Sequence, residues 1–232
     1  MTDLNDLDLH NVTINIPTDA QEILSTLEAD GRQAYVVGGC VRDSLIGRTP
    51  GDWDITTSAL PMQVKQLFRR TVDTGIKHGT VTVMMGDTGY EVTTYRIDGN
   101  YADGRHPDSV EFSANLRDDL KRRDFTINAM AYNNSDGLVD EFNGIGDLQA
   151  GIVRCVGDAR ERFTEDALRM MRAIRFSAQL GFIIDEDTYS AIGAMADTIS
   201  KVSMERIHDE LGKILMSDHP DYVKRLCDTR LT

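Results

Sequence analysis

Two aspartates in Asp52-Trp53-Asp54-Ile55 carry the clearest chemical signal in this chain. The run from Asp52 to Thr56 predicts a β-strand, and side chains alternate along a strand. Asp52 and Asp54 would therefore share one face, about 6–7 Å apart, while Trp53 and Ile55 face the core. Two carboxylates directed at one point suit Mg²⁺, which commonly takes one or two carboxylates together with substrate phosphates. The alternative is an exposed strand with two solvated aspartates.

A glycine pair precedes these aspartates, with twelve residues between Gly39 and Asp52. It follows an expected strand, Ala34 to Val37, and opens a short helix that Gly47 can end. Because Gly38 and Gly39 have no Cβ, the backbone can approach a triphosphate closely, and amides at the helix start can bind it. The spacing therefore favours nucleotide chemistry over a plain surface strand.

The elements that position these residues are expected to alternate between strand and helix. Thr18 with Gln21 forms a possible capping box for a helix ending before Gly31, and Pro61 starts another helix that ends near residue 69. Gly86-Asp87-Thr88-Gly89 separates β-rich runs at 80–85 and 90–96, which is a hairpin pattern. These elements predict a small mixed sheet flanked by helices.

The ends of the chain and one internal stretch differ from this pattern. Residues 1–17 have no clear period and predict a loose arm, and the polar, Gly-rich stretch 97–113 predicts a mobile loop. Apolar residues at three- and four-residue spacing predict helices at about 164–180, 185–199, 203–216 and 219–229. We expect an arm at 1–17, a head domain at 18–157 and a helical neck at 158–232. The chain stops at an amphipathic helix without Gly or Pro, which predicts a longer natural protein.

The composition is that of a globular protein. The chain has 232 residues, 41% of them hydrophobic, and no apolar run of about 18 residues that could span a membrane. Cys40, Cys155 and Cys227 are far apart and form no C-x-x-C pattern, so neither a disulfide framework nor a zinc site is indicated. These features predict a cytoplasmic protein with reduced thiols and no membrane partner.

The formal net charge of −13 argues against a nucleic-acid partner, because phosphate binding needs clustered basic side chains. Position weakens this objection, since basic residues crowd the middle of the chain. They are Arg117, Lys121, Arg122, Arg123, Arg154, Arg160, Arg162, Arg169, Arg172 and Arg175. An RNA-binding surface on an acidic protein is therefore compatible with the sequence.

Four motifs in one order resemble those of the bacterial-type tRNA nucleotidyltransferase and poly(A) polymerase family, within the DNA polymerase β-like nucleotidyltransferase superfamily. The resemblance covers about residues 30–215. The motifs are Gly38-Gly39-Cys40-Val41-Arg42-Asp43, Asp52-Trp53-Asp54, Arg122-Arg123-Asp124-Phe125-Thr126-Ile127-Asn128-Ala129 and Glu165-Asp166-Ala167-Leu168-Arg169. The implied fold is α+β, a polymerase β-like head with a small mixed sheet, followed by an all-helical neck.

The resemblance also implies roles in the head. Glu91, which shares a strand face with Thr93, would join Asp52 and Asp54 as the third catalytic and metal-binding carboxylate. An exposed cross-strand charge is the alternative for Glu91. Two magnesium ions would then support in-line transfer to the primer 3′-hydroxyl, with pyrophosphate leaving.

Further residues are implied to bind the nucleotide. Arg123 would contact phosphate, and Asp124 and Asn128 would lie near the ribose, where a carboxylate can accept a hydrogen bond from the 2′-hydroxyl. By themselves Arg122, Arg123 and Asp124 indicate an exposed charge cluster with Asp124 as a helix cap. Arg42 and Asp43 are implied on the phosphate side, and a structural Arg–Asp pair is the alternative.

Asp166 and Arg169 are expected three residues apart on one helix, where an i, i+3 salt bridge is the simplest interpretation. The resemblance instead implies an amino-acid template. Cytosine and adenine each present an amino donor beside a ring-nitrogen acceptor, which a carboxylate and a guanidinium can pair with, while uracil and guanine are repelled. Glu165 would orient this pair, although charge at a helix N-terminus also explains it.

The implied function is addition of C, A or both from CTP and ATP to an RNA 3′ end, with tRNA CCA addition favoured. A poly(A) polymerase of the same family is one alternative, and a non-catalytic nucleotide- or RNA-binding fragment is another. Two further segments match the family more weakly, Gly75–Thr80 beside the site and Asp140–Gly144 with Asp147-Leu148 as a linker. His208-Asp209 lacks the partners that a metal phosphohydrolase needs.

Overall fold

The computed structural model describes residues 12–99 and 110–231. These residues form two compact units. The first comprises 12–98, 110–123 and 128–142, and the second comprises 99, 124–127 and 143–231. Residues 1–11 of the expected arm and 100–109 of the expected loop lie outside the described residues.

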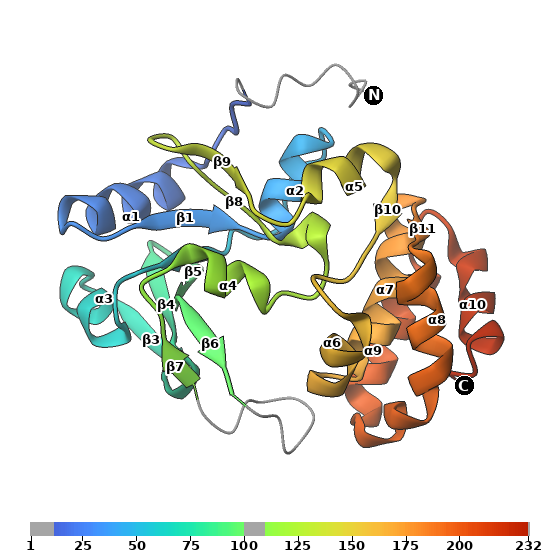
Figure 1. The fold of residues 1–232 in the computed structure, drawn as a ribbon. Helices are drawn as coiled ribbons and strands as arrows, with labels where there is room; N and C mark the ends of the chain where they lie inside the picture. Colours follow the sequence, from blue (N-terminus) through green and yellow to red (C-terminus); the bar gives the residue numbers. More distant parts are fainter. Residues whose placement is uncertain (1–11, 100–109, 232) are drawn as a thin grey trace. The chain divides into compact units, whose positions relative to one another are not determined.

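A seven-stranded mixed sheet forms the centre of the first unit (Figure 1). Its strand order is β3-β4-β5-β2-β1-β8-β9, in which β2 and β5 are parallel and the other neighbours are antiparallel. The strands are β1 (Ala34–Val37), β2 (Ile55–Thr57), β3 (Thr71–Gly75), β4 (Thr80–Met85), β5 (Thr88–Thr94), β8 (Met130–Asn133) and β9 (Gly137–Asp140). The mixed sheet expected from the sequence is confirmed.

Helices α1 (Thr18–Ala29) and α3 (Pro61–Leu67) contact this sheet, as Figure 1 shows. Ile23, Leu24 and Leu27 of α1 are fully buried, and burial of each such side chain contributes about 1.5–3 kcal/mol. The expected capping box is wrong, because α1 starts at Thr18 itself and extended Pro17 occupies the cap position without a side-chain bond. A hydroxyl inside the first turn cannot cap that turn.

The hairpin at 86–89 is confirmed, since β4 and β5 pair from Thr80↔Thr93 to Met85↔Thr88. Two parts of the expected loop are regular instead, because β6 (Arg96–Asp98) and β7 (Val110–Phe112) pair in antiparallel fashion. The unit also contains α2 (Gly39–Leu45) and α4 (Leu116–Lys121). Helix α4 contacts β6 and carries a buried aspartate, Asp119.

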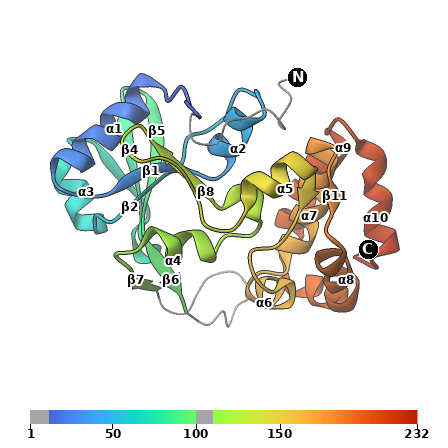
Figure 2. The same ribbon diagram turned by 45° about the horizontal axis from the view of Figure 1, so that its top comes forward.

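The second unit is mainly helical (Figure 2). Its elements are α5 (Gly144–Ala150), β10 (Ile152–Val153), α6 (Ala159–Glu165), α7 (Leu168–Leu180), β11 (Ile183–Ile184), α8 (Glu186–Met195), η4 (Ala196–Lys201), α9 (Met204–Leu215), η5 (Pro220–Val223) and α10 (Lys224–Asp228). Helix α7 contacts α6, α9, η5 and α10, and its residues Met170, Ala173 and Ile174 are fully buried. Phe125 joins this core through an edge-to-face contact with Phe176, with ring centroids 5.7 Å apart.

The helix expected at 164–180 is two helices. Asp166 is extended, with φ −145° and ψ 106°, and it separates α6 from α7. Its Oδ1 accepts the Leu168 N–H at 3.0 Å, which satisfies a donor at the start of α7. Asp166 and Arg169 therefore do not share a continuous helix face.

Candidate active site

The two aspartates lie directly before strand β2, not within it as the sequence suggested. The strand begins at Ile55, which is 1% exposed, while Trp53 is only half-buried. The carbonyl of Asp54 still accepts a hydrogen bond from the Val37 N–H at 3.0 Å, so β1 fixes this segment. Asp52 is exposed. The aspartates thus sit at a strand end, where the side chains can face solvent and substrate.

The carboxyl group of Asp54 has a clearly shifted pKa. Burial raises its pKa to about 6; Arg123 opposes this shift, and the negative charges of Asp52 and Glu91 add to it. These three groups act on Asp54 because they lie near it. Glu91 is exposed on β5, opposite Thr82 of β4. The first unit therefore brings the three expected carboxylates and Arg123 into one electrostatic neighbourhood.

The conformation of Gly38 makes room for Arg123. Gly38 has φ +83°, a region that only glycine adopts readily, and a Cβ built on it would lie 3.1 Å from Arg123 Nη1. The Gly38 N–H donates to the Met130 carbonyl at 3.1 Å. Substitution at this position is thus opposed by backbone strain and by the guanidinium beside it.

Asp119 binds the guanidinium of Arg123. This aspartate was not identified as a site residue from the sequence. It is fully buried and accepts hydrogen bonds from Arg123 Nη2 at 3.2 Å, Arg122 Nη2 at 2.7 Å and Thr56 Oγ1 at 3.1 Å. Burial alone would raise the pKa of Asp119, but the two guanidinium groups lower it below its ordinary value. Its position three and four residues before Arg122 and Arg123 was a usable signal on helix α4.

Arg42, Asp43 and Asn128 form a compact polar group. Arg42 is 8% exposed, and it donates through Nε to Asp43 Oδ1 at 2.8 Å and through Nη1 to Asn128 Oδ1 at 2.6 Å. The structural Arg–Asp pair considered for the sequence is therefore present. A role for this group on the phosphate side stays a prediction.

Asp124 lies in the second unit, where it caps no α-helix. Its Oδ1 accepts the Phe125 N–H at 2.8 Å, and its Oδ2 accepts bonds from Arg172 Nε at 2.8 Å and Nη2 at 2.5 Å. Asp124 is 7% exposed. Arg172 comes from helix α7, so no local sequence pattern indicated this partner.

The residues expected to select the base also have distant partners. Asp166 Oδ2 accepts a bond from Arg206 Nη2 of helix α9 at 2.7 Å. Arg169 Nη1 donates to Glu165 Oε2 at 2.5 Å, and Glu165 Oε1 also pairs with Arg162 at 2.5 Å. Glu165 thus orients the guanidinium of Arg169, whereas Arg206 orients the carboxylate of Asp166.

The carboxylates of the first unit fit a divalent cation. Within 12–99 and 110–231, no three acidic, histidine or cysteine side chains form a ready-made metal-binding group. Burial nevertheless raises the pKa of Asp54, and the like charges of Asp52 and Glu91 add to that rise, so a bound cation would favour the ionised carboxylate. Magnesium needs only one or two protein carboxylates when substrate phosphates complete its shell. The donor set therefore suits Mg²⁺.

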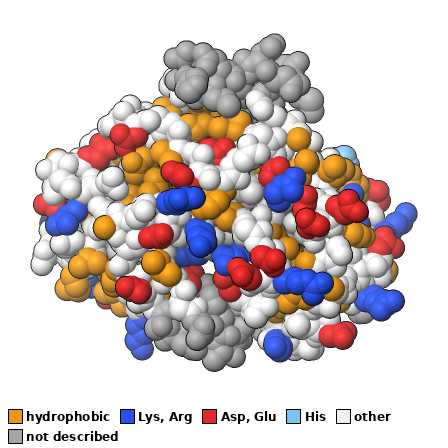
Figure 3. All heavy atoms as spheres, viewed as in Figure 1, with side chains coloured by type: hydrophobic (Ala, Val, Ile, Leu, Met, Phe, Trp, Pro, Cys, Tyr) orange, Lys and Arg blue, Asp and Glu red, His pale blue; other side chains and the backbone are white. Residues whose placement is uncertain are grey.

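The central arginines are largely paired with acidic side chains. The pairs are Arg122–Asp119, Arg123–Asp119, Arg154–Asp147, Arg162–Glu165, Arg169–Glu165, Arg172–Asp124 and Arg175–Glu210. Figure 3 shows basic and acidic side chains interspersed on the visible face. The cluster that the sequence indicated is thus a set of ion pairs and not an unbroken basic patch.

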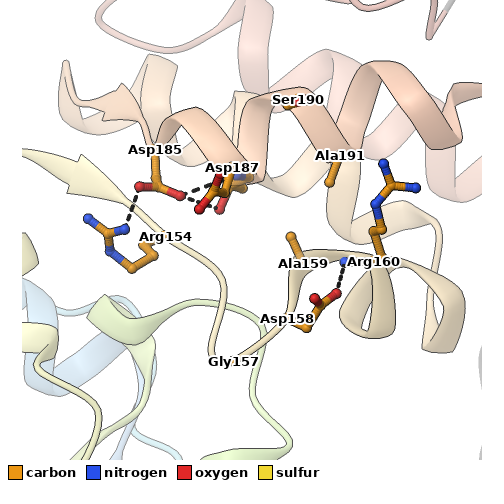
Figure 4. Close-up of a pocket in the computed structure, with 10 residues that line it drawn as sticks. Arg154, Gly157, Asp158, Ala159, Arg160, Asp185, Asp187, Ser190 and Ala191 are labelled. Carbon is orange, nitrogen blue, oxygen red and sulfur yellow. Dashed lines mark hydrogen bonds and ion pairs between the residues drawn. The ribbon is translucent and has the colours of Figure 1, made fainter.

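A pocket of about 330 Å³ in the second unit contains none of the expected site residues. Arg154 pairs there with Asp185, the residue that caps helix α8, and Asp158 accepts the Arg160 N–H at the start of α6 (Figure 4). The partners of these charged groups are other residues that line the pocket. We therefore interpret the pocket as a gap between the first turns of α6 and α8.

Comparison with known proteins agrees with the motifs. Residues 34–154 match the family model described as the poly A polymerase head domain, and residues 181–232 match the model described as the probable RNA and SrmB-binding site of polymerase A. The CCA-adding enzyme of Leuconostoc mesenteroides is 54% identical over 198 residues, which is 85% of this chain and 49% of that enzyme. The enzyme of Ligilactobacillus salivarius is 48% identical over 221 residues, covering 94% and 55%.

Solved structures show the same fold. The Bacillus stearothermophilus CCA-adding enzyme in complex with CTP matches with a TM-score of 0.86 and 43% identity, over 94% of this chain and 54% of that one. The Thermotoga maritima CCA-adding enzyme complexed with tRNA matches with a TM-score of 0.75 and 27% identity, over 91% and 50%. The chain spans about half the length of the curated relatives it matches. None of the helices in the described part of the chain is long and apolar enough to cross a membrane.

Proposed function

The chain belongs to the poly A polymerase head-domain family, and from this premise we propose that it is the catalytic portion of a tRNA nucleotidyltransferase. It would add C and A from CTP and ATP to the 3′ end of a tRNA, releasing pyrophosphate at each step. Three relatives at 51–54% identity are CCA-adding enzymes, which favours CCA addition over poly(A) synthesis.

One observation carries this proposal: the charges of Asp52, Glu91 and Arg123 all act on Asp54. Burial and the charges of Asp52 and Glu91 disfavour the ionised form of Asp54, and a bound cation would offset them. The arginine in the same neighbourhood suits the negative charge of a nucleotide phosphate. A bound cation would account for the negative carboxylates, and a bound triphosphate would account for the positive arginine.

The residues of the first unit would bind the phosphates and the metal. Asp52, Asp54 and Glu91 would hold two Mg²⁺ ions, which when bound lower the pKa of the RNA 3′-hydroxyl and neutralise charge at the α-phosphate. Arg123, fixed by Asp119 against Gly38, would contact phosphate without having to reorganise. Gly38 and Gly39 keep side chains out of the path of the triphosphate.

The remaining expected site residues would recognise the ribose and the base. Asp124 would accept a hydrogen bond from the 2′-hydroxyl, with Asn128 near the same sugar. Asp166 would accept from the amino group of cytosine or adenine while Arg169 donates to the ring nitrogen. Arg42 and Asp43 would support the phosphate side through the bond from Arg42 to Asn128.

We further propose that the head extends over residues 18–157 and the neck over 158–232, that the protein acts in the cytoplasm, and that its RNA partner is recognised by both parts. The match of residues 181–232 to a described RNA-binding region supports the last point. No membrane partner is proposed.

The test is pyrophosphate release from the purified chain with a tRNA lacking CCA, CTP, ATP and Mg²⁺. We expect C and A to be added only with Mg²⁺, and Asp54→Asn to lose at least about a hundredfold in rate, as removal of a metal ligand does. Processive addition of A alone would favour the poly(A) polymerase alternative. Nucleotide and tRNA binding without any pyrophosphate release would mean that the chain is a binding module.

A further inference from the structure

One arginine of helix α7 fixes the carboxylate of Asp124. Arg172 donates to Oδ2 through both Nε, at 2.8 Å, and Nη2, at 2.5 Å, while the backbone N–H of Phe125 donates to Oδ1. The carboxylate is 8% exposed and the guanidinium is 34% exposed. The charge-assisted bonds from Arg172 and the bond from Phe125 hold this nearly buried carboxylate in one orientation.

That orientation matters if Asp124 accepts a hydrogen bond from a 2′-hydroxyl. A carboxylate accepts a hydrogen bond most strongly while it is ionised, because its protonated form carries a donor O–H, and a hydroxyl donor must approach an oxygen whose position is already set. Arg172 can meet both requirements. Its positive charge favours the ionised carboxylate of Asp124, and its two donor nitrogens fix the position of the carboxylate. Arg172 lies 48 residues from Asp124 in the sequence, so the packing of helix α7 brings this charge to Asp124.

We propose that Arg172 is a positioning residue for sugar selection, which sets how strongly this protein prefers a ribonucleotide to its 2′-deoxy counterpart. The inference rests on the proposed function, in which Asp124 meets the ribose. Arg172 itself need not touch the nucleotide.

The same helix offers a matched control. Arg175 also pairs with a buried carboxylate, Glu210, through Nε at 2.6 Å, and both arginines lie over the ring of Phe176, at 5.3 Å for Arg172 and 4.0 Å for Arg175. Glu210 is on helix α9 and has no proposed nucleotide contact. Loss of Arg175 therefore removes a similar ion pair from α7 while both hydrogen bonds from Arg172 to Asp124 remain.

The experiment measures Kd for CTP and for 2′-deoxy-CTP with Mg²⁺, together with the thermal midpoint, in the 232-residue chain and its variants. Arg172→Gln should lower the ratio Kd(dCTP)/Kd(CTP) about tenfold, which corresponds to about 1.4 kcal/mol, because the 2′-hydroxyl would lose a charged and oriented acceptor. Arg175→Gln should lower the thermal midpoint and leave that ratio unchanged. Adding Asp124→Asn to Arg172→Gln should cause no further loss of the ratio.

A conservative variant covers the case in which Arg172→Gln does not fold. Arg172→Lys keeps the charge but not the fork, so the ratio should fall about threefold. A wild-type ratio in folded Arg172→Gln or Arg172→Lys would overturn the proposal, as would a wild-type protein that binds CTP and dCTP equally. A wild-type protein that binds neither nucleotide with Mg²⁺ would instead contradict the proposed function.

Discussion

Asp119→Asn is expected to destabilise the first unit by about 3 kcal/mol. Asp119 is fully buried, and its carboxylate is the shared acceptor for Arg122 and Arg123. Breaking a buried ion pair by removing one partner costs about 3–5 kcal/mol, because the remaining charge is left without compensation. We take the lower end because both arginine side chains are 18% exposed and can regain some hydration. Asparagine has the size of aspartate and keeps one acceptor oxygen. The loss of stability therefore measures the contribution of the negative charge.

The assay is urea unfolding followed by Trp53 fluorescence. Trp53 is the single tryptophan of the chain and lies in the first unit, so its signal reports that unit. The control is Asp73→Asn, which breaks the exposed Lys65–Asp73 pair, 2.8 Å long, and should cost less than about 1 kcal/mol. If Asp119→Asn costs no more than Asp73→Asn, the reasoning about the buried carboxylate is refuted.

The difference in unfolding free energy between wild type and Asp119→Asn should depend on pH. The arginines hold the folded-state pKa of Asp119 below its ordinary value, which is about 3.9 in unfolded chains. Folded wild type therefore binds fewer protons at Asp119 than the unfolded chain does. Its stability advantage over Asp119→Asn is fully present above about pH 4. As the pH falls through the folded-state pKa, the advantage should shrink. An advantage that grows on acidification would contradict the sign of this shift.

Three other predictions concern the proposed activity. Asp52→Asn should lower the rate at least about a hundredfold with little effect on urea stability, because an exposed carboxylate rarely supports a core; full nucleotide incorporation would reject the metal assignment. Asp166→Ala should lower the CTP:UTP ratio of kcat/KM by about tenfold, within the 1–3 kcal/mol of a base contact, whereas an unchanged ratio would exclude the template role. RNA affinity should fall about tenfold between 50 and 200 mM salt if two phosphates are contacted, and a constant affinity would mean that the arginines are structural only.

The elements that sequence patterns predicted well are those with local signals. Strand β1 has the expected bounds, and the turn at Gly86-Asp87 joins β4 to β5 as expected. The misses involve long-range or cooperative effects. Strand β2 starts three residues late because only Ile55 onward pairs with β1 and β5 at full register. The break at Asp166 was hidden because the apolar period continues through it, while the Asp166 side chain caps the next helix.

In the candidate site, too, the sequence identified residues within local motifs but not their partners from distant parts of the chain. Ordered motifs identified the carboxylates and arginines that are proposed to meet the substrate, because their types and spacing are local. The groups that hold them come from elsewhere in the chain: Arg172 for Asp124 and Arg206 for Asp166. Such partners follow only from how the helices of the second unit pack.

This pairing of arginines with acidic side chains also resolves the conflict between a net charge of −13 and the proposed RNA substrate. Each ion pair fixes a guanidinium, and a fixed guanidinium binds phosphate with less loss of side-chain entropy than a mobile one. The acidic partners lower the net charge but do not remove the donors, since a guanidinium has five N–H groups and a carboxylate occupies two of them at most in a single fork. An acidic protein of this design should bind RNA through a few well-placed contacts. It should also bind weakly to nucleic acid elsewhere, because most of the central arginines in the described part of the chain are paired with acidic side chains, and non-specific binding depends on basic surface.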